Sequence, residues 1–222
     1  LLNIKREVAH LNWSLKRPMQ YWERLQVAEE ENWQRPSLFR CAPERRNFVV
    51  LDLDLSSVDL RSSLYSLQVL LTPHLRKLNL KKNRFFGGNI ELLRSCRQLR
   101  ELELSRTGVE GNLASLQDMQ YLSKLGLQCC SQVKGEIICI GSFHYLSVLR
   151  LGATGVVGTL HDIKNLIGLR VLHLGHASIG GDLAEVAGFS NIHELVADKT
   201  LIIGSIEELS RSRKLRILSL NY

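Results

Sequence analysis

Four side chains near the middle of the sequence are of the types that bind a metal ion. Cys129, Cys130, Cys139 and His144 lie close together in the sequence, and thiolate and imidazole ligands at short spacings commonly hold Zn²⁺. The repeat described below puts Cys130 in a buried turn and Cys139 on the outer arc of one coil. Because these positions lie on opposite sides of the coil, we predict no metal site.

A second stretch has the glycine content of a phosphate-binding loop. Gly152, Gly155 and Gly158 occur in the sequence Gly-Ala-Thr-Gly-Val-Val-Gly. A phosphate cradle of the usual kinds needs G-x-G-x-x-G or a final G-K-[ST], and neither pattern occurs. No arrangement of Ser, His and Asp or of Cys and His suggests nucleophilic catalysis. We therefore expect a protein that is not an enzyme and has no cofactor.

A repeat of about two dozen residues must position all of these side chains. The pattern L-x-x-L-x-L, with two looser copies, starts at residues 48, 75, 99, 122, 146, 169, 192 and 215. The leucines at its fourth and sixth positions share one face of a short strand, because side chains alternate along a strand. A single coil cannot bury them, whereas stacked coils can, with their strands paired into one parallel sheet.

The second half of each unit repeats as well. A β-branched or aromatic residue precedes a Gly by two positions, and an aliphatic residue follows it by two. These glycines are Gly88, Gly111, Gly135, Gly158, Gly181 and Gly204. A recurring Gly indicates a tight turn or a close backbone approach, and the i, i+3 apolar spacing that follows suits a 3₁₀ turn. We expect the six glycines to form one row along the stacked coils.

These motifs resemble those of the leucine-rich-repeat superfamily and are most similar to the class found in plant receptors and many protist proteins. The resemblance covers residues 48–222 and implies a curved α/β solenoid, a right-handed coil with a parallel β-sheet on its concave face. The buried turn Asn of that family is Asn83 in one repeat only. Ala177 takes its place in another, and we expect a weaker contact between coils there because its side chain cannot form hydrogen bonds.

In this fold the side chains between the strand leucines point into the concave face and are not needed for the core. We expect the following to contact a partner: Lys77, Asn79, Lys81, Lys82, Glu101, Glu103, Arg106, Arg150, His173 and His176. Lys77, Lys81 and Lys82 form the densest basic spot. The stretch from Val148 to His176 is small and weakly charged, which lets a helix or loop approach closely. The resulting prediction is a non-catalytic scaffold with a rigid concave surface that binds another protein, alone or within a large complex.

The net charge of +7 over 222 residues is unevenly distributed. Residues 1–47 carry nine basic and six acidic groups, residues 48–98 eight and four, and residues 99–222 twelve of each. A protein that tracks nucleic acid is expected to spread its positive charge along the phosphates. An alternative nevertheless stays open, in which the chain is a structural subunit of a ribonucleoprotein or other large assembly that contacts RNA through residues 1–98.

The N-terminal segment, residues 1–47, does not share the repeat. Apolar residues on one face predict a helix over residues 2–16, and Pro18 suits the first position of a second helix. We expect a helical cap over the first coil or a docking segment, and a further alternative is an F-box-like substrate receptor of a ubiquitin ligase. The sequence stops directly after a strand, so we expect it to be a fragment truncated at its C-terminus.

The expected location follows from two absences in the sequence. No apolar run approaches the roughly 20 residues that cross a bilayer, so we expect no membrane span in this segment. The five cysteines are odd in number and form no C-x-x-C pair, which argues against a disulfide framework. We therefore expect an intracellular protein of the cytoplasm or nucleus.

Overall fold

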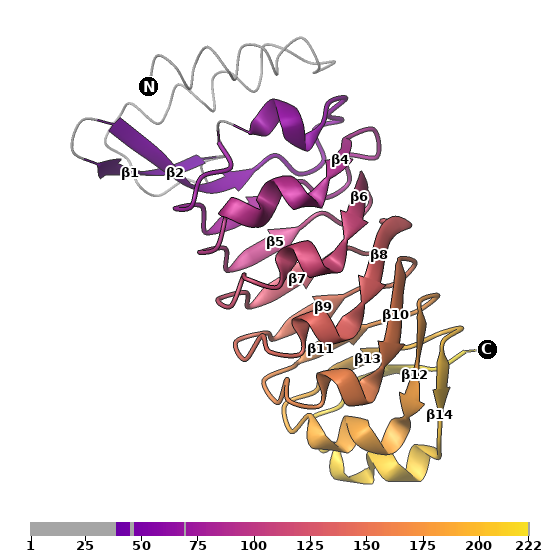
Figure 1. The fold of residues 1–222 in the computed structure, drawn as a ribbon. Coiled ribbons are helices and arrows are strands. Elements are labelled where there is room, and N and C mark those ends of the chain that lie inside the picture. The colour runs from indigo at the N-terminus through magenta and orange to yellow at the C-terminus, as the bar shows by residue number, and fades with distance from the viewer. Residues whose placement is uncertain (1–38, 45–46, 69, 222) are drawn as a thin grey trace.

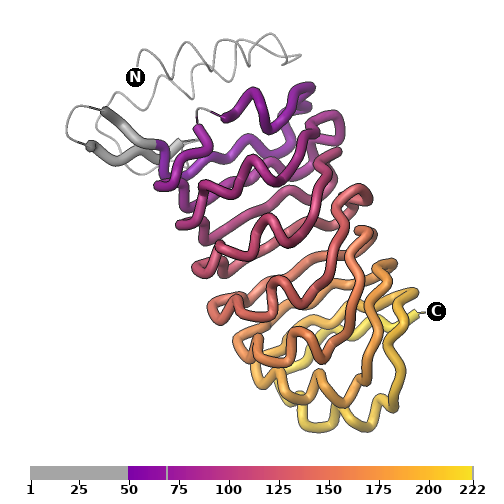
Figure 2. Tube along the Cα trace, viewed as in Figure 1, coloured from indigo at the N-terminus to yellow at the C-terminus, as the bar shows by residue number. Residues whose placement is uncertain are grey.

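The computed structural model describes residues 39–44, 47–68 and 70–221. Their coils stack one after another into a curved solenoid that runs from the indigo to the yellow end of the chain (Figure 1). Each complete unit contributes a strand to a concave sheet, then a strand to a second sheet, then a short 3₁₀ helix. The tube in Figure 2 follows each unit as one turn of the coil.

The concave sheet contains nine strands in the described part of the chain, in the order β1-β2-β3-β5-β7-β9-β11-β13-β15. Their bounds are β1 Phe39–Glu44, β2 Asn47–Asp54, β3 Lys77–Asn79, β5 Glu101–Glu103, β7 Lys124–Gly126, β9 Val148–Arg150, β11 Val171–His173, β13 Glu194–Val196 and β15 Ile217–Ser219. From β2 onward neighbouring strands are parallel, and their central leucines pair directly, as Leu78 does with Leu102.

The leucines of the repeat form the core. Leu102, Leu125, Leu149 and Leu172 are fully buried, as are the sixth-position leucines that follow each of them by two residues. Burial of one such side chain contributes about 2 kcal/mol. The predicted alternation of inward leucines with residues on the sheet face is confirmed by this pattern.

The first unit lies two residues out of the predicted register. Residue 48 was the expected start, but Leu53 pairs with Leu78, so the unit starts at Val50. Ser57 then occupies the left-handed turn that Lys82 and Arg106 occupy in the next two units. A shift of two residues keeps the same side chains on the same face of a strand, so both registers satisfy the apolar pattern.

The N-terminal segment contains a strand within the part of it that is described. β1 pairs with β2 in antiparallel fashion, so residues 39–44 extend the concave sheet. The two predicted helices and the greater part of the predicted 1–47 cap lie outside the described residues.

The second sheet has six parallel strands in the described ranges, in the order β14-β12-β10-β8-β6-β4. Their bounds are β4 Gly87–Asn89, β6 Gly108–Asn112, β8 Gln132–Glu136, β10 Gly155–Thr159, β12 Ser178–Asp182 and β14 Leu201–Ile203. All six predicted glycines lie in this sheet or directly after it, with φ between +103° and +134°. A side chain rarely adopts these angles, which explains why Gly recurs here.

Short 3₁₀ helices close the coils, as the i, i+3 spacing predicts. They are η2 Leu64–Leu67, η3 Ile90–Ser95, η4 Leu113–Leu116, η5 Ile137–Ile140, η6 Leu160–Ile163, η7 Leu183–Gly188 and η8 Ile206–Arg211. The side chains of Asn89, Asn112, Asp182 and Ser205 each accept a hydrogen bond from the backbone N–H two residues later. These bonds satisfy donors that a helix start leaves free. No helix among the described residues is both long and apolar enough to span a bilayer.

Candidate functional site

The strands of the concave sheet bring the ten predicted contact residues onto one face or to its edge. Lys77, Glu101, Glu103, Arg150 and His173 lie within the strands, between or beside the buried leucines. The remaining five follow the strands closely or lie at a strand end. Parallel pairing places Lys77 beside Glu101 and Arg150 beside His173. Side chains from four units therefore share this face.

Several of these residues are more buried than expected for side chains that are free to contact a partner. Lys77, Lys82, Arg106 and His176 are exposed, whereas the side chain of Glu103 is only 4% exposed. Asn79, Lys81, Glu101, Arg150 and His173 are half-buried. The physical reason is that side chains of adjacent units lean on one another across the sheet.

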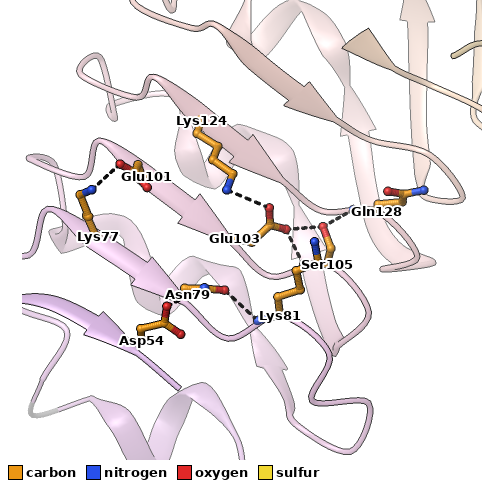
Figure 3. A network of polar contacts seen from close by, with 9 residues as sticks. All are labelled: Asp54, Lys77, Asn79, Lys81, Glu101, Glu103, Ser105, Lys124 and Gln128. Atoms are coloured by element: carbon orange, nitrogen blue, oxygen red, sulfur yellow. Dashed lines mark hydrogen bonds and ion pairs between the residues drawn. The ribbon is translucent and has the colours of Figure 1, made fainter. Parts of the chain in front are cut away.

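Polar contacts join the first four units (Figure 3). Lys77 Nζ lies 2.6 Å from Glu101 Oε1, and Lys124 Nζ lies 3.6 Å from Glu103 Oε2. Asn79 donates from Nδ2 to Asp54 at 2.9 Å and accepts from the Lys81 N–H at 3.2 Å. Two of the lysines on this face are therefore already paired with carboxylates.

Glu103 is buried because the next unit has Gly126 at the paired position. A Cβ on Gly126 would lie only 2.6 Å from Glu103 Oε2, so the carboxylate occupies the space that a side chain would fill. Oε1 accepts hydrogen bonds from the Ser105 hydroxyl and, at 3.3 Å, from the Ser105 N–H. Oε2 has Lys124 at ion-pair distance but has no hydrogen bond.

In the C-terminal half of the concave face, glycines lie beside the polar side chains. Gly152 and Gly175 have no side chain, so the backbone near Arg150 and His173 is not covered at these positions. His173 Nε2 lies 3.3 Å from Glu194 Oε2. The pKa of His173 is lowered, chiefly because burial disfavours its charged form and then because Arg150 lies nearby.

Asp198 closes the described end of the face. It accepts hydrogen bonds from the Ser219 hydroxyl at 2.7 Å and from the Asn221 N–H at 2.7 Å. These donors, Ser219 first, lower the pKa of the Asp198 carboxyl. The last strand is thus joined to its neighbour by a charged side chain as well as by backbone pairing.

The cysteines within the described repeat occupy the positions that the repeat predicts. Cys130 is buried in a turn, Cys139 lies in η5, and Cys129 is exposed. Among the described residues no group of three or more His, Cys, Asp or Glu side chains could hold a metal ion. Burial raises the pKa of the Cys96 thiol to about 11, so this thiol is protonated at neutral pH. The intracellular location expected from the cysteines stays a prediction.

Solved structures share this arrangement. The plant peptide hormone receptor RGFR1, in complex with RGF2, matches over 77% of this chain with 25% identity and a TM-score of 0.64. PEPR1, in the PEPR1–AtPEP1 structure, matches over 100% with 22% identity and a TM-score of 0.71. Internalin C2 of Listeria monocytogenes matches over 95% with 20% identity and a TM-score of 0.64. The chain has the leucine-rich-repeat fold.

The extent of these matches differs between the two kinds of protein. The leucine-rich-repeat chain covers 28% of the RGFR1 chain and 31% of the PEPR1 chain, but 86% of internalin C2. No family model matches the sequence, and no curated protein sequence matches it. The fold is therefore established by the repeat and the structural likeness together.

Two features of the face were not found by sequence reasoning. One is the burial of Glu103, for which the signal was a Gly 23 residues later at the same position of the next unit. The other is the pairing of Lys77 with Glu101 and of Lys124 with Glu103. The repeat spacing already placed these residues on adjacent strands, so opposite charges at neighbouring positions could have indicated both pairs.

Proposed function

We propose that this leucine-rich-repeat chain is a protein-interaction scaffold whose concave sheet presents a rigid, preformed surface to another protein. The observation that carries the proposal is the alternation of buried and sheet-face residues along each strand. The leucines at alternate positions are fully buried, whereas the residues between them are mostly polar or small and occupy the sheet face. Such a face binds with little loss of conformational entropy, because the backbone is already ordered.

The structural likeness supports the same kind of function. RGFR1 is a peptide hormone receptor and was solved in complex with RGF2. We propose a contact centre on β9 and β11, where Gly152 and Gly175 allow close approach and Arg150 and His173 offer polar groups. Glycines at a contact surface let a partner backbone come near, while the flanking side chains provide specificity.

Of the two alternatives, RNA binding would depend on a group of lysines, one of which is already paired with a carboxylate. Lys77 is paired with Glu101, whereas Lys81 and Lys82 have no ion pair to a described residue. The F-box alternative depends on residues 1–47, most of which lie outside the described ranges. Both stay predictions, and neither has an observation that favours it over the scaffold.

Site-specific photo-crosslinking tests the proposal. A benzophenone amino acid at Val148 or Val171, on the concave sheet, should form a covalent adduct with the same partner protein in cells that make the chain. The matched controls are Ile138 and Ile167, which are exposed and lie outside the concave sheet. The proposal also requires that Arg150→Glu reduces the adduct from Val171 without lowering the melting temperature. Adducts from the control positions alone would contradict it.

A further inference from the structure

Six of the cations on units two to four fall into two groups. Lys77 and Lys124 lie on the concave face, and each has a carboxylate within 4 Å. Lys81, Lys82, Arg84 and Arg106 follow the strands β3 and β5, and no carboxylate of the described residues lies within ion-pair distance of them. We call these four residues the basic edge. Unpaired cations held close together repel one another, so their repulsion is relieved when an anionic group binds.

Backbone geometry holds the basic edge together. Lys82 N–H donates to Ser105 O at 2.9 Å, so the turn that carries Lys82 lies directly against the turn that carries Arg106. Both residues have left-handed backbone angles, with φ of 64° and 61°. Both side chains are exposed, and Arg84 is exposed two residues beyond Lys82. The cations thus project from two stacked turns whose spacing is fixed by the sheet, about 4.8 Å per unit.

An exposed aromatic ring borders the basic edge. Phe85 is adjacent to Arg84 in the sequence and is 53% exposed. The guanidinium of Arg61 lies 4.4 Å from the centre of its ring, and Arg61 is itself 3.7 Å from Asp59. The charge of Arg61 is therefore partly matched, and the ring is held in place. Aromatic and arginine side chains are the types that protein interfaces favour.

We propose that the basic edge and Phe85 bind an acidic segment of a protein partner. The inference rests on the proposed scaffold function and adds a second contact beside the concave face. One observation favours a short acidic segment over a nucleic acid. The same turn position is occupied in the next three units by Cys129, Ala153 and His176, so the row of Lys and Arg ends after two units. A bound nucleic acid would gain from cations that continue along its phosphates.

The test compares two variants of the full chain with equal changes in charge. The first, Lys81→Glu, Lys82→Glu, Arg84→Glu and Arg106→Glu, reverses the basic edge. The control reverses four exposed arginines of the last units, which have no ion pair among the described residues: Arg170, Arg211, Arg213 and Arg216. The probes are a twelve-residue peptide of alternating Glu and Ser and a twelve-nucleotide single-stranded RNA, both labelled with fluorescein. Binding of each probe is measured by fluorescence anisotropy at two salt concentrations.

The proposal predicts that the unaltered chain binds the acidic peptide, that reversal of the basic edge weakens binding at least tenfold, and that the control stays within twofold. Equal loss in both variants would show an effect of net charge alone and would overturn the proposal, as would no binding of the peptide. Tighter binding of RNA, lost in the first variant only, would assign the edge to nucleic acid instead. Photo-crosslinking from Val171 separates the two hypotheses, because it can succeed even if the basic edge binds nothing.

Discussion

Asn83 and Ala177 occupy the same buried turn position in two units of one solenoid, and they contact their neighbours differently. Asn83 donates from Nδ2 to Leu55 O and Leu80 O, both at 2.8 Å. Its Oδ1 accepts from the N–H groups of Val58 and Leu60, at 3.2 and 3.0 Å. Ala177 has only its backbone bond to Leu174 O, at 2.9 Å.

Intermediate cases lie between these two. The hydroxyls of Thr107, Thr154 and Thr200 each donate to a carbonyl of their own unit, and the thiol of Cys130 donates to Leu104 O of the preceding unit. Hydroxyl and thiol groups therefore bond to the backbone at this position, and the Thr107 hydroxyl also lies 3.6 Å from the Cys130 sulfur of the next unit. The comparison shows that leucine packing and backbone pairing suffice to stack two units, while a buried amide adds a connection between them.

The largest effect is expected where the shared core itself is changed. Leu149→Asp places a charge at a fully buried position between β7 and β11, where it has no partner. We expect the cooperative thermal transition to disappear or to fall by more than about 15 °C in circular dichroism. Arg150→Asp, one residue later on the sheet face, is the control and should melt near the unaltered protein. A Leu149→Asp variant as stable as this control would remove the basis of the comparison.

A smaller effect on stability is expected when the side-chain amide of Asn83 is removed. Asn83→Ala removes four hydrogen bonds and leaves buried backbone groups of two units without partners, which should cost about 3 kcal/mol. Thr154→Ala removes one bond within its own unit and should cost about 1 kcal/mol. Urea denaturation of both variants measures the difference. Equal losses would mean that the amide does not connect the units.

A substitution at Ala177 should add a side-chain hydrogen bond to a turn that has none. Ala177→Thr introduces a hydroxyl at a position where three other units already hold a Thr, so the donor should reach Leu174 O. We expect a gain of up to about 1 kcal/mol in the free energy of unfolding. A loss of stability instead would show that the turn at Ala177 is too closely packed for the larger side chain.

The smallest effect concerns pH. The pKa of His173 is lowered in the folded chain, so the unfolded chain binds a proton more readily. Stability from this residue is therefore complete above its ordinary pKa, near 6.5, and decreases as the pH falls through that value toward the lowered one. His173→Gln should flatten the dependence of the melting temperature on pH between about 7 and 5. An unchanged profile would show that His173 does not contribute to it.

The fold could be predicted because every unit repeats the same physical requirement. Leucines at alternate positions and a Gly at the turn are fixed by local geometry, so their spacing reveals them. The first unit was misplaced because Phe48-Leu51-Leu53 and Val50-Leu53-Leu55 both give an apolar face, and only the pairing with β3 decides between them. The burial of Glu103 was missed because it depends on Gly126 in the next unit, which a single-unit pattern does not describe.

The most direct test of the account is a scan of three consecutive positions in β11. Leu172→Ser alters the buried face of this strand, whereas Val171→Ser and His173→Ser alter its concave face. If alternate residues form the core and leave the others free for a partner, Leu172→Ser should lower the melting temperature by about 10 °C, and the other two by less than about 3 °C. Three similar losses, or a larger loss at Val171 or His173 than at Leu172, would contradict the account.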